Sequence, residues 1–403
     1  MKIVIAGAGI GGLTAALCLQ RKGFDVQILE QVREIRPLGV GINVMPHAAG
    51  VLHRPGLGPA LDDIAIRTRC IEYRTRFGHL IQSDPRSVEY GFEYPQYSVH
   101  RGELQFLLLD AVRQRIGGDA VIAGKGFAEF RQHAGGVTVT CDDGTACDAA
   151  LLIGADGFHS RLRRQLHPDE GPAHYEGTMM WRGANLQARL GDGRTMFIAG
   201  DHDVKFVCYP ISGRADREGR SLVNWVAEVR RDQPRAAETA DWTAEGGRDF
   251  IAAFAGFLMP DIDVMKLLRE TAHITQYPMI DRDPLPFWTK GRVTLLGDAA
   301  HPMYPIGANG ASQAIMDAEA LADALERHSA TTAGLAAYED VRRPVTSRVV
   351  LTNRQSGPEK VLDIAAARVK GPQDRIEDLI TPEELEAVAA GYRDIAGFQR
   401  KTD

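Results

Sequence analysis

The sequence predicts a two-domain α/β (α+β) protein: a Rossmann-like domain, a second domain built on a β-sheet, and a C-terminal helical tail. An apolar run over residues 2–6 leads directly into a glycine-rich turn and then a helix, which is how a doubly wound parallel sheet begins. Two later apolar runs, residues 149–154 and 292–298, suit strands buried on both faces. Residues 175–278 are instead rich in separate β-prone segments, which indicates a second sheet.

The composition is that of an ordinary soluble globular protein. The chain has 403 residues, enough for two or three domains, with 44% hydrophobic and 25% charged residues. A formal net charge of −6 gives no reason to expect a nucleic acid or an anionic membrane as partner. The five cysteines are irregularly spaced and include no Cys-x-x-Cys, so they indicate neither a disulfide framework nor a metal site. We find no signal peptide and no apolar run long enough to span a membrane, and we expect a cytoplasmic protein.

The first turn carries the pattern G-x-G-x-x-G at Gly7, Gly9 and Gly12, with Gly11 inside it. Gly7 permits the tight turn from strand to helix, Gly9 lets the backbone approach a pyrophosphate, and Gly12 lets the helix lie close to the strand. The pyrophosphate would lie against the free N–H groups at the helix N-terminus. Because glycine-rich turns are common, the pattern predicts a dinucleotide site only together with its flanking strand and helix.

An acidic residue stands at the end of the second predicted strand, residues 25–29. Glu30 lies 18 residues beyond Gly12, where a carboxylate accepts both hydroxyl groups of an adenosine ribose and repels a 2′-phosphate. This favours FAD or NAD over NADP at this site, although the nearby Arg33 weakens the preference.

The rest of the first half alternates between helices and short strands. We expect a glycine-punctuated loop or edge strand over 34–43, a helix over 46–52, a hairpin over 69–82 and a helix over 101–112. Short antiparallel strands are expected at 121–123, 128–132 and 137–141, before the buried strand that ends at Gly154 and a helix that carries Arg161, Arg163 and Arg164.

The second half begins with sheet-forming segments and ends with helices. Strands are expected at 178–183, 194–199, 204–210 and 221–229, helices at 249–257 and 262–268, a buried strand at 292–298, and helices at 311–327, 338–353 and 375–396. These assignments divide the chain into a first domain (1–72, 98–174 and 277–330), a second domain (73–97 and 175–276) and a C-terminal helical segment (331–403).

Two aspartates follow buried strands, Asp156 in Gly-Ala-Asp-Gly and Asp298 in Gly-Asp-Ala-Ala-His. Both carboxylates are expected at the carboxyl edge of the sheet, where open α/β proteins bind ligands. The alternative for either residue is an ordinary turn or helix N-cap aspartate. The loop 302–311 that follows Asp298 adds backbone N–H groups at a helix start, which suits an anionic or electron-rich ligand edge.

With these three motifs in this order, the chain resembles the single-component (class A) FAD-dependent monooxygenases related to para-hydroxybenzoate hydroxylase, over roughly residues 1–350. Within that family, four segments are most similar to the phenazine hydroxylases that act on 5-methylphenazine-1-carboxylate: residues 36–43, 95–105, 180–183 and 276–286. The chain departs from the family's pattern at residues 43–47, at Pro302 and in the C-terminal tail.

The resemblance implies that FAD is the cofactor and that NADH or NADPH is a co-substrate without a Rossmann site of its own. Glu30 would hold the adenosine ribose, Arg101 the phosphate and ribose region, and Asp298 the ribityl or pyrophosphate region. For Arg101 the alternative is an ion pair with Glu103 or Glu72. The implied FAD contacts are Gly7, Gly9, Gly11, Gly12, Glu30, Gly41, Arg101, Asp156, Gly157, Asp298, Gly307, Ala308, Asn309 and Gly310, of which Asp156 and Gly157 would also face NAD(P)H.

The implied activity is hydroxylation of an aromatic or N-heteroaromatic substrate by O2 and NAD(P)H through a flavin C4a-hydroperoxide. A phenazine-carboxylate-like substrate would extend this to replacement of a ring carboxylate by hydroxyl, with Arg182, Arg69 or Arg74 holding the carboxylate. Pro305 would face the oxygen-reacting side of the flavin. For a general base, we consider His47, Tyr209 and Tyr304.

Six residues are candidates for the substrate pocket: Met45, Trp181, Arg182, Tyr209, Trp225 and Tyr304. Core packing is the alternative for Met45, Tyr209 and the tryptophans, and a surface or capping position is the alternative for His47. Other functions open to this scaffold are a flavin reductase or oxidase without oxygen insertion, an NAD dehydrogenase, and a non-catalytic FAD redox sensor. We expect no metal site, and a monomer or homodimer.

Overall fold

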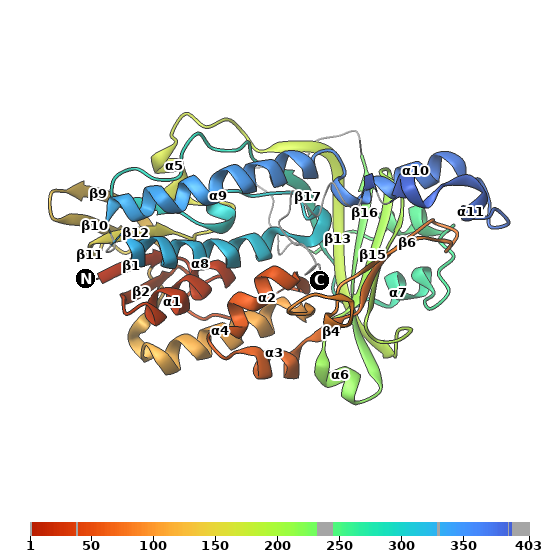
Figure 1. Cartoon of the computed structure of the whole chain (residues 1–403), viewed down its shortest axis with the longest axis horizontal. Coiled ribbons are helices and arrows are strands. Elements are labelled where there is room, and N and C mark those ends of the chain that lie inside the picture. Colours follow the sequence, from red (N-terminus) through yellow and green to blue (C-terminus); the bar gives the residue numbers. More distant parts are fainter. Residues whose placement is uncertain (1, 38, 232–244, 329–330, 386, 389–403) are drawn as a thin grey trace.

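The computed structural model describes residues 2–37, 39–231, 245–328, 331–385 and 387–388. Two sheets dominate the molecule. A five-stranded sheet and its helices lie at one end, and a seven-stranded sheet lies at the other (Figure 1). The fold is mixed helix and strand, and the five-stranded sheet is parallel, as the sequence predicts.

The five-stranded sheet is entirely parallel and has the order β18-β12-β1-β2-β8. The expectation that residues 121–123 are antiparallel is wrong: this strand pairs in parallel with β2, because the long helix α4 carries the chain across the sheet first. The strands are β1 (Lys2–Ala6), β2 (Asp25–Glu30), β8 (Val121–Ala123), β12 (Leu151–Gly154) and β18 (Val293–Leu295), and the helices packed around α1 (Ile10–Arg21) are α4 (Arg101–Arg115) and α8 (Gly310–Arg327).

The seven-stranded sheet has the order β17-β13-β16-β15-β14-β5-β6 and is antiparallel except between β14 and β5. The predicted domain boundaries after residues 72 and 276 fall inside β5 and β17, which this sheet contains as whole strands. Its strands are β5 (Cys70–Arg74), β6 (Leu80–Pro85), β13 (His174–Ala188), β14 (Thr195–Gly200), β15 (Val204–Pro210), β16 (Arg220–Arg230) and β17 (Thr275–Asp281).

Alternate residues along these strands face two different cores, because side chains in a strand point to opposite faces. On β13, Met180 joins one apolar cluster and Trp181 joins the other, and on β16, Val226 and Trp225 separate in the same way. The first cluster includes residues of α10 (Lys360–Arg368), and the second includes residues of η4 (Asp249–Phe254) and α7 (Val264–Glu270).

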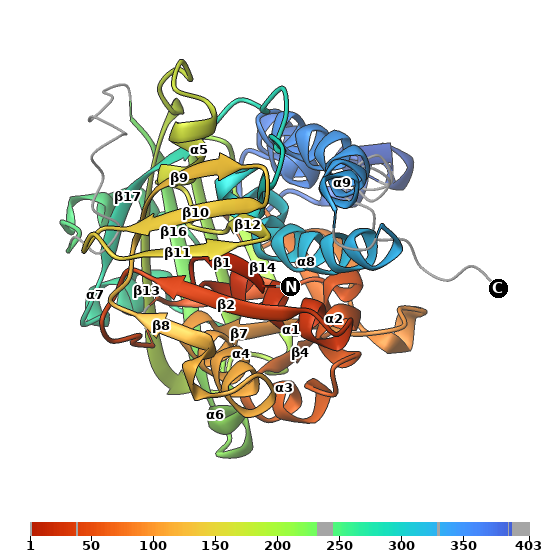
Figure 2. The same cartoon turned by 90° about the vertical axis from the view of Figure 1, so that its left-hand side faces the viewer.

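Two three-stranded sheets complete the β-structure. One has the order β3-β7-β4, and the other, β11-β10-β9, lies next to β1 and β2 in Figure 2. Their strands are β3 (Gly41–Val44), β4 (Ile66–Thr68), β7 (Gln96–His100), β9 (Phe127–His133), β10 (Gly136–Cys141) and β11 (Ala146–Ala149).

The C-terminal segment runs from the five-stranded sheet to the seven-stranded one. Helix α9 (Thr332–Asn353) lies along α8 and leads to η7 (Gly357–Glu359), α10 and α11 (Ile376–Leu379) (Figure 1). Part of the helix predicted at 375–396, namely residues 386 and 389–396, lies outside the described residues. In the described part of the chain, no helix has the length and apolar composition needed to cross a lipid bilayer. The other helices of the described residues are α2 (Pro46–His53), α3 (Gly58–Ile64), η1 (Val88–Tyr90), η2 (Gly118–Ala120), α5 (Arg161–Leu166), α6 (Gly213–Arg217), η5 (Gly297–Ala299) and η6 (Ile306–Ala308).

Candidate active site

Four strand ends of the parallel sheet meet at one edge. Ala6 at the end of β1 is in register with Leu29 of β2 and with Gly154 of β12, and Gly154 is in register with Leu295 of β18. The turns that follow these strands therefore lie side by side. They carry the glycine loop, Glu30, Asp156 and Asp298, which the sequence separates by up to 291 positions from Gly7.

The glycine loop is close-packed on one side and open on the other. A Cβ atom on Gly7 would lie 2.3 Å from the carbonyl oxygen of Ala155, and one on Gly12 would lie 2.1 Å from that of Gly7. A Cβ atom on Gly9 would meet no atom within 4 Å. Gly9 therefore faces free space at the N-terminus of α1, where a pyrophosphate fits without moving the chain.

The carboxylate of Glu30 is fixed against this loop. It accepts a hydrogen bond of 2.7 Å from the backbone N–H of Ala8 and one of 3.0 Å from that of Val32, and the side chain is buried. Each carboxylate oxygen has a second lone pair. Glu30 can thus brace the loop and still accept a ribose hydroxyl.

Asp156 helps to cap a helix whose N-cap residue is Ser160, a role close to the N-cap alternative that the sequence leaves open. Its carboxylate accepts hydrogen bonds from the Ser160 hydroxyl and from the backbone N–H groups of Arg161, at 2.8 Å, and Leu162, at 3.2 Å. These contacts hold the start of α5 at the sheet edge. Gly157 follows with φ of +78°, so the turn requires glycine.

A buried ionic cluster stands behind the turn of Asp298. The Asp317 carboxylate accepts hydrogen bonds from the Gly297 N–H at 3.0 Å and the Arg342 guanidinium at 2.7 Å, and lies 2.6 Å from His301 Nε2. These partners lower the pKa of Asp317 to about 2 despite its burial. Asp298 itself lines a cavity at this edge of the sheet, and desolvation raises the pKa of its carboxyl.

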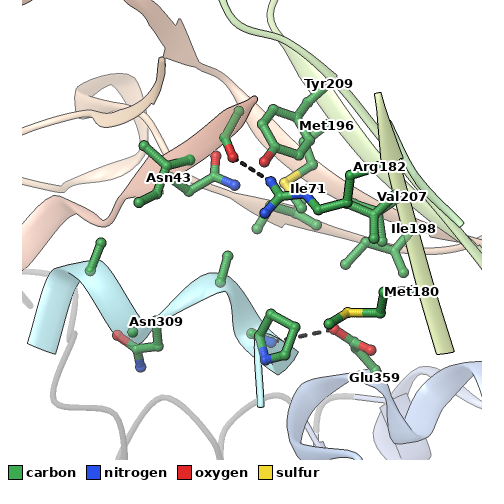
Figure 3. Close-up of a pocket in the computed structure, with 18 of the residues that line it drawn as sticks. Asn43, Ile71, Met180, Arg182, Met196, Ile198, Val207, Tyr209, Asn309 and Glu359 are labelled. Atoms are coloured by element: carbon green, nitrogen blue, oxygen red, sulfur yellow. Dashed lines mark hydrogen bonds between the residues drawn. The ribbon is translucent and has the colours of Figure 1, made fainter. Parts of the chain in front are cut away.

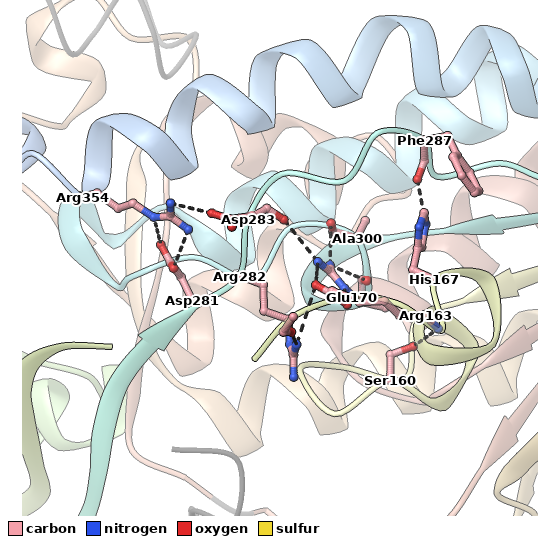
Figure 4. Close-up of polar contacts among 12 residues, drawn as sticks. Ser160, Arg163, His167, Glu170, Asp281, Arg282, Asp283, Phe287, Ala300 and Arg354 are labelled. Atoms are coloured by element: carbon pink, nitrogen blue, oxygen red, sulfur yellow. Dashed lines mark hydrogen bonds and ion pairs between the residues drawn. The ribbon is translucent and has the colours of Figure 1, made fainter. Parts of the chain in front are cut away.

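Arg163, for which the sequence suggests no role, joins two of the motifs. Its guanidinium donates to the carbonyl oxygens of Ala300 at 2.9 Å and Ala299 at 3.1 Å, and pairs with Glu170 at 2.6 Å (Figure 4). Arg163 belongs to the helix that Asp156 caps, and the two alanines directly follow Asp298. The fully buried Arg163 therefore fixes the spacing of the two turns.

A cavity of about 250 Å³ lies between this edge and the inner face of the seven-stranded sheet (Figure 3). The predicted site residues that line it are Gly41, Arg101, Arg182, Tyr209, Asp298, Pro305, Gly307, Ala308, Asn309 and Gly310. Asn43, from the segment that departs from the family's pattern, also lines it, and the sequence does not predict the lining residues Ile71, Tyr73, Arg86, Met180, Met196, Ile198, Val207, Val226, Glu228, Tyr277 and Glu359.

The loop over residues 305–310 forms one wall of the cavity. Gly307 and Ala308 have φ of 68° and 53°, and the loop leads into the N-terminus of α8. Behind it, the Gly307 N–H donates to Glu359 at 3.3 Å. The buried side chain of Asn309 has an amide nitrogen without a hydrogen-bond partner in the described structure. The wall thus offers the Asn309 amide as a donor to an electron-rich ligand edge.

The two tryptophans do not line the cavity, and the prediction that they do is wrong. Trp181 and Trp225 lie on the outer face of the sheet, where Trp181 stacks on Phe250 at 4.6 Å and Trp225 donates to Thr271 at 3.0 Å. Their neighbours Met180 and Val226 face the cavity instead. Strand alternation is the cause, since one position along a strand changes the face.

Met45, Tyr304 and His47 also lie outside the cavity lining. Met45 is fully buried, and Tyr304 shares a hydrogen bond of 2.8 Å with His174. Burial lowers the pKa of His47 to about 3, which makes it a poor proton acceptor near neutral pH. Tyr209 does face the cavity, but desolvation raises its pKa to about 12 and keeps its hydroxyl protonated.

Of the three arginines considered for a carboxylate, the cavity contains only Arg182. Arg69 pairs with Asp192 and Arg74 pairs with Glu72, each at 2.6 Å, away from the cavity. Arg182 donates to the Tyr277 hydroxyl at 3.1 Å and to the Gly41 carbonyl. It has no ion-pair partner, and its Nε has no hydrogen-bond partner, among the described residues.

Arg101 faces the cavity close to Asp298, and its charge partly opposes the desolvation that raises the pKa of the Asp298 carboxyl. Neither Glu103 nor Glu72 forms an ion pair with it in the described structure, and Glu72 instead pairs with Arg74. The alternative of a surface ion pair therefore does not hold. The Arg101 side chain also packs against Gly39, where an added Cβ would lie 3.3 Å from its Cδ.

Comparisons with known proteins agree with this arrangement. A family model described as FAD binding domain matches residues 1–353. Phenazine 1,6-dicarboxylic acid hydroxylase PhzS of Lysobacter antibioticus is 44% identical over 90% of this chain and 94% of that protein. The 6-hydroxynicotinate 3-monooxygenase of Pseudomonas fluorescens is 31% identical over 86% of this chain and 89% of that protein. The solved structure of Klebsiella pneumoniae HpxO with FAD and uric acid has a TM-score of 0.75 and 26% identity, covering 99% of this chain and 93% of that one.

Proposed function

We propose that this chain, which belongs to the family of FAD-dependent aromatic monooxygenases, hydroxylates a planar N-heteroaromatic carboxylic acid of the phenazine-carboxylate type. Its cofactor is FAD, and NADH or NADPH and O2 are its co-substrates. Bound FAD supplies hydride acceptance and oxygen activation. The chain's own residues bind the ring, orient it and exclude water.

The observation that best supports the proposed substrate class is the environment of the Arg182 side chain. Its guanidinium lies in the wall of a mostly apolar cavity without a carboxylate partner among the described residues. A half-buried cation without a counter-ion in a mostly apolar wall is costly, and a bound carboxylate would satisfy it. Desolvation opposes the charge of Arg182, but the flanking Tyr277 and Tyr209 outweigh it and raise the pKa of Arg182, so it stays charged.

The rest of the cavity suits a flat ring. Its sheet wall is formed mainly by apolar side chains, and the opposite wall by the loop of Pro305 and Gly307. A planar substrate between them would have one ring face on the sheet and its edge toward the loop. The apolar side chains of the sheet wall are Ile71, Met180, Met196, Ile198, Val207 and Val226.

We infer that FAD lies along the strand ends. The open space above Gly9 would take the pyrophosphate, and Glu30 the adenosine ribose. Arg101 and Asp298 would contact the middle of the cofactor, and the loop from Gly307 to Gly310 its ring system. This order follows the direction from the glycine loop toward the cavity.

The names of the relatives support an acidic substrate. One is named for phenazine 1,6-dicarboxylic acid and another for 6-hydroxynicotinate. The first test is therefore a screen of phenazine 1,6-dicarboxylate, phenazine-1-carboxylate, 5-methylphenazine-1-carboxylate and 6-hydroxynicotinate under labelled dioxygen. A product that contains one labelled oxygen supports the proposal. A loss of carbon dioxide in the same product would show decarboxylative hydroxylation, and NAD(P)H consumption that yields only peroxide would contradict the proposed substrate class.

The second test concerns Arg182. Arg182→Met should weaken binding of the carboxylated substrate by about 10- to 100-fold, the range for a hydrogen-bonded charge. Its binding of the corresponding carboxamide should change little. Arg74→Met is the matched control, because Arg74 lies on the same sheet but pairs with Glu72 outside the cavity. Equal affinity of wild type and Arg182→Met for the acid would refute the assignment.

A further inference from the structure

A second, polar cavity of about 30 Å³ adjoins the substrate cavity. The two share two lining residues, the buried Glu228 of β16 and Glu359 of η7. The second cavity is also lined by Asp201, His202 and Asp363. His202 is exposed at the protein surface, so this cavity leads toward solvent.

Lys205 of β15 joins the two shared carboxylates. Its ammonium lies 2.8 Å from Glu228 and pairs directly with Glu359, and all three residues are less than a tenth exposed. The other oxygen of Glu359 accepts the hydrogen bond from Gly307 in the cavity wall. A continuous chain of polar groups thus runs from the cavity wall to the second cavity.

The reaction needs such a chain because it consumes a proton. Hydroxylation of a ring carbon uses one O2, one NAD(P)H and one proton: one oxygen atom enters the C–H bond, and the other leaves as water. The hydride supplies two electrons, and solvent must supply the proton. A cavity that excludes water during the reaction therefore requires a route by which this proton enters.

We propose that Glu228 and Glu359, bridged by Lys205, carry protons between the second cavity and the substrate cavity. A cavity of this size and polarity can hold a water molecule that hands the proton on from the surface. The inference goes beyond the proposed substrate, since any hydroxylation in this cavity needs the proton.

The charges of the cluster suit a proton carrier. Two carboxylates share one ammonium, so one of them can take up a proton without leaving a charge unpaired. Burial and the neighbouring Glu359 raise the pKa of Glu228, while Lys205 and Arg182 oppose the rise. The charged groups that face the cluster from the side of the second cavity are Glu176, Asp201, His202, Arg354 and Asp363.

One experiment tests the route without any substrate. Infrared titration of the FAD-loaded enzyme should show a protonated-carboxyl band that persists above the pH at which a solvent-exposed glutamate ionises, and that is missing from both Glu228→Gln and Glu359→Gln. Glu72→Gln, which alters an ion pair on the other face of the sheet, should keep the band. If the wild-type enzyme shows no such band, or if neither variant removes it, the proposal is wrong. Failure of the substrate proposal does not affect this readout.

A second experiment uses turnover with whichever screened acid gives the oxygenated product. Glu228→Gln and Glu359→Gln should each lower kcat by about tenfold or more, with KM little changed, and should increase the solvent isotope effect. Formate or imidazole added to the buffer should restore part of the lost rate, which a purely structural role would not allow. Wild-type kcat in both variants, or a loss that neither small acid restores, would overturn the proposal.

Discussion

Asp317 and His301 are joined by a buried hydrogen bond of 2.6 Å behind the turn that presents Asp298. Arg342 completes the cluster at 2.7 Å. Asp317→Asn would leave Arg342 as an uncompensated buried charge, which typically costs about 3 to 5 kcal/mol of the free energy of unfolding. Urea denaturation at neutral pH, with Asp323→Asn on the exposed face of the same helix as control, measures this loss.

The same cluster predicts how the free energy of unfolding depends on pH in acid. The pKa of Asp317 falls from 3.8 to about 2 on folding, so its stabilisation is complete above pH 3.8 and is lost as the pH falls through about 2. The difference in unfolding free energy between wild type and Asp317→Asn should therefore narrow over this window. A difference that stays constant down to pH 2 would show that the carboxylate is not held ionised.

The contacts of Arg163 predict a separate effect, on the affinity of the protein for FAD. Arg163→Met removes the donors that hold the carbonyls of Ala299 and Ala300, so the turn of Asp298 loses its spacing from Asp156. We expect FAD to bind about tenfold more weakly, which corresponds to about 1.4 kcal/mol. Titration of the apoprotein by flavin fluorescence measures this. Arg164→Met, on the exposed side of the same helix, should bind FAD as wild type does, and an equal loss in both variants would contradict the assignment.

Much of the nucleotide-binding edge could be predicted from the sequence, because parallel strands bring their carboxyl ends to one edge. Gly7, Glu30 and Asp298 lie there for that reason. The sheet wall was less predictable. Trp181 and Trp225 are candidates for the pocket from the sequence, but the face of a strand residue depends on its register with partners far along the chain.

The residues of the proposed proton route lie in segments that contain no sequence motif. Lys205 and Glu228 are isolated charged residues within apolar strand segments. These isolated charges were the signal in the sequence that could have indicated a buried polar cluster. Glu359 reaches them from the C-terminal segment, whose packing on the sheet could not be derived from its helical pattern. Asp156 shows the converse, since a motif position can serve as a helix cap.

His47 predicts a different pH effect. Because burial lowers its pKa to about 3, the folded protein keeps it neutral, whereas the unfolded chain protonates it near pH 6.5. The unfolded state thus gains protons first, and stability should fall as the pH falls from about 6.5 toward 3. In acid denaturation, His47→Gln should lose less stability than wild type over this pH range. The pH profile of kcat should show no limb near pH 6.5 that depends on His47. A limb at that pH that disappears in the variant would restore His47 as a general base.

The glycine loop allows folding and cofactor binding to be separated with two substitutions of the same size. Gly9→Ala places a methyl group in open space, so the free energy of unfolding should change by less than about 1 kcal/mol. The methyl group would meet the pyrophosphate, and FAD should bind at least about tenfold more weakly.

Gly12→Ala instead forces a Cβ atom to 2.1 Å from the Gly7 carbonyl oxygen, which should cost about 3 kcal/mol of the free energy of unfolding even without FAD. Urea unfolding of both apoproteins and fluorescence titration with FAD give the two quantities. Wild-type FAD affinity in Gly9→Ala would place the pyrophosphate elsewhere, and an undisturbed stability in Gly12→Ala would show that α1 can shift away from β1.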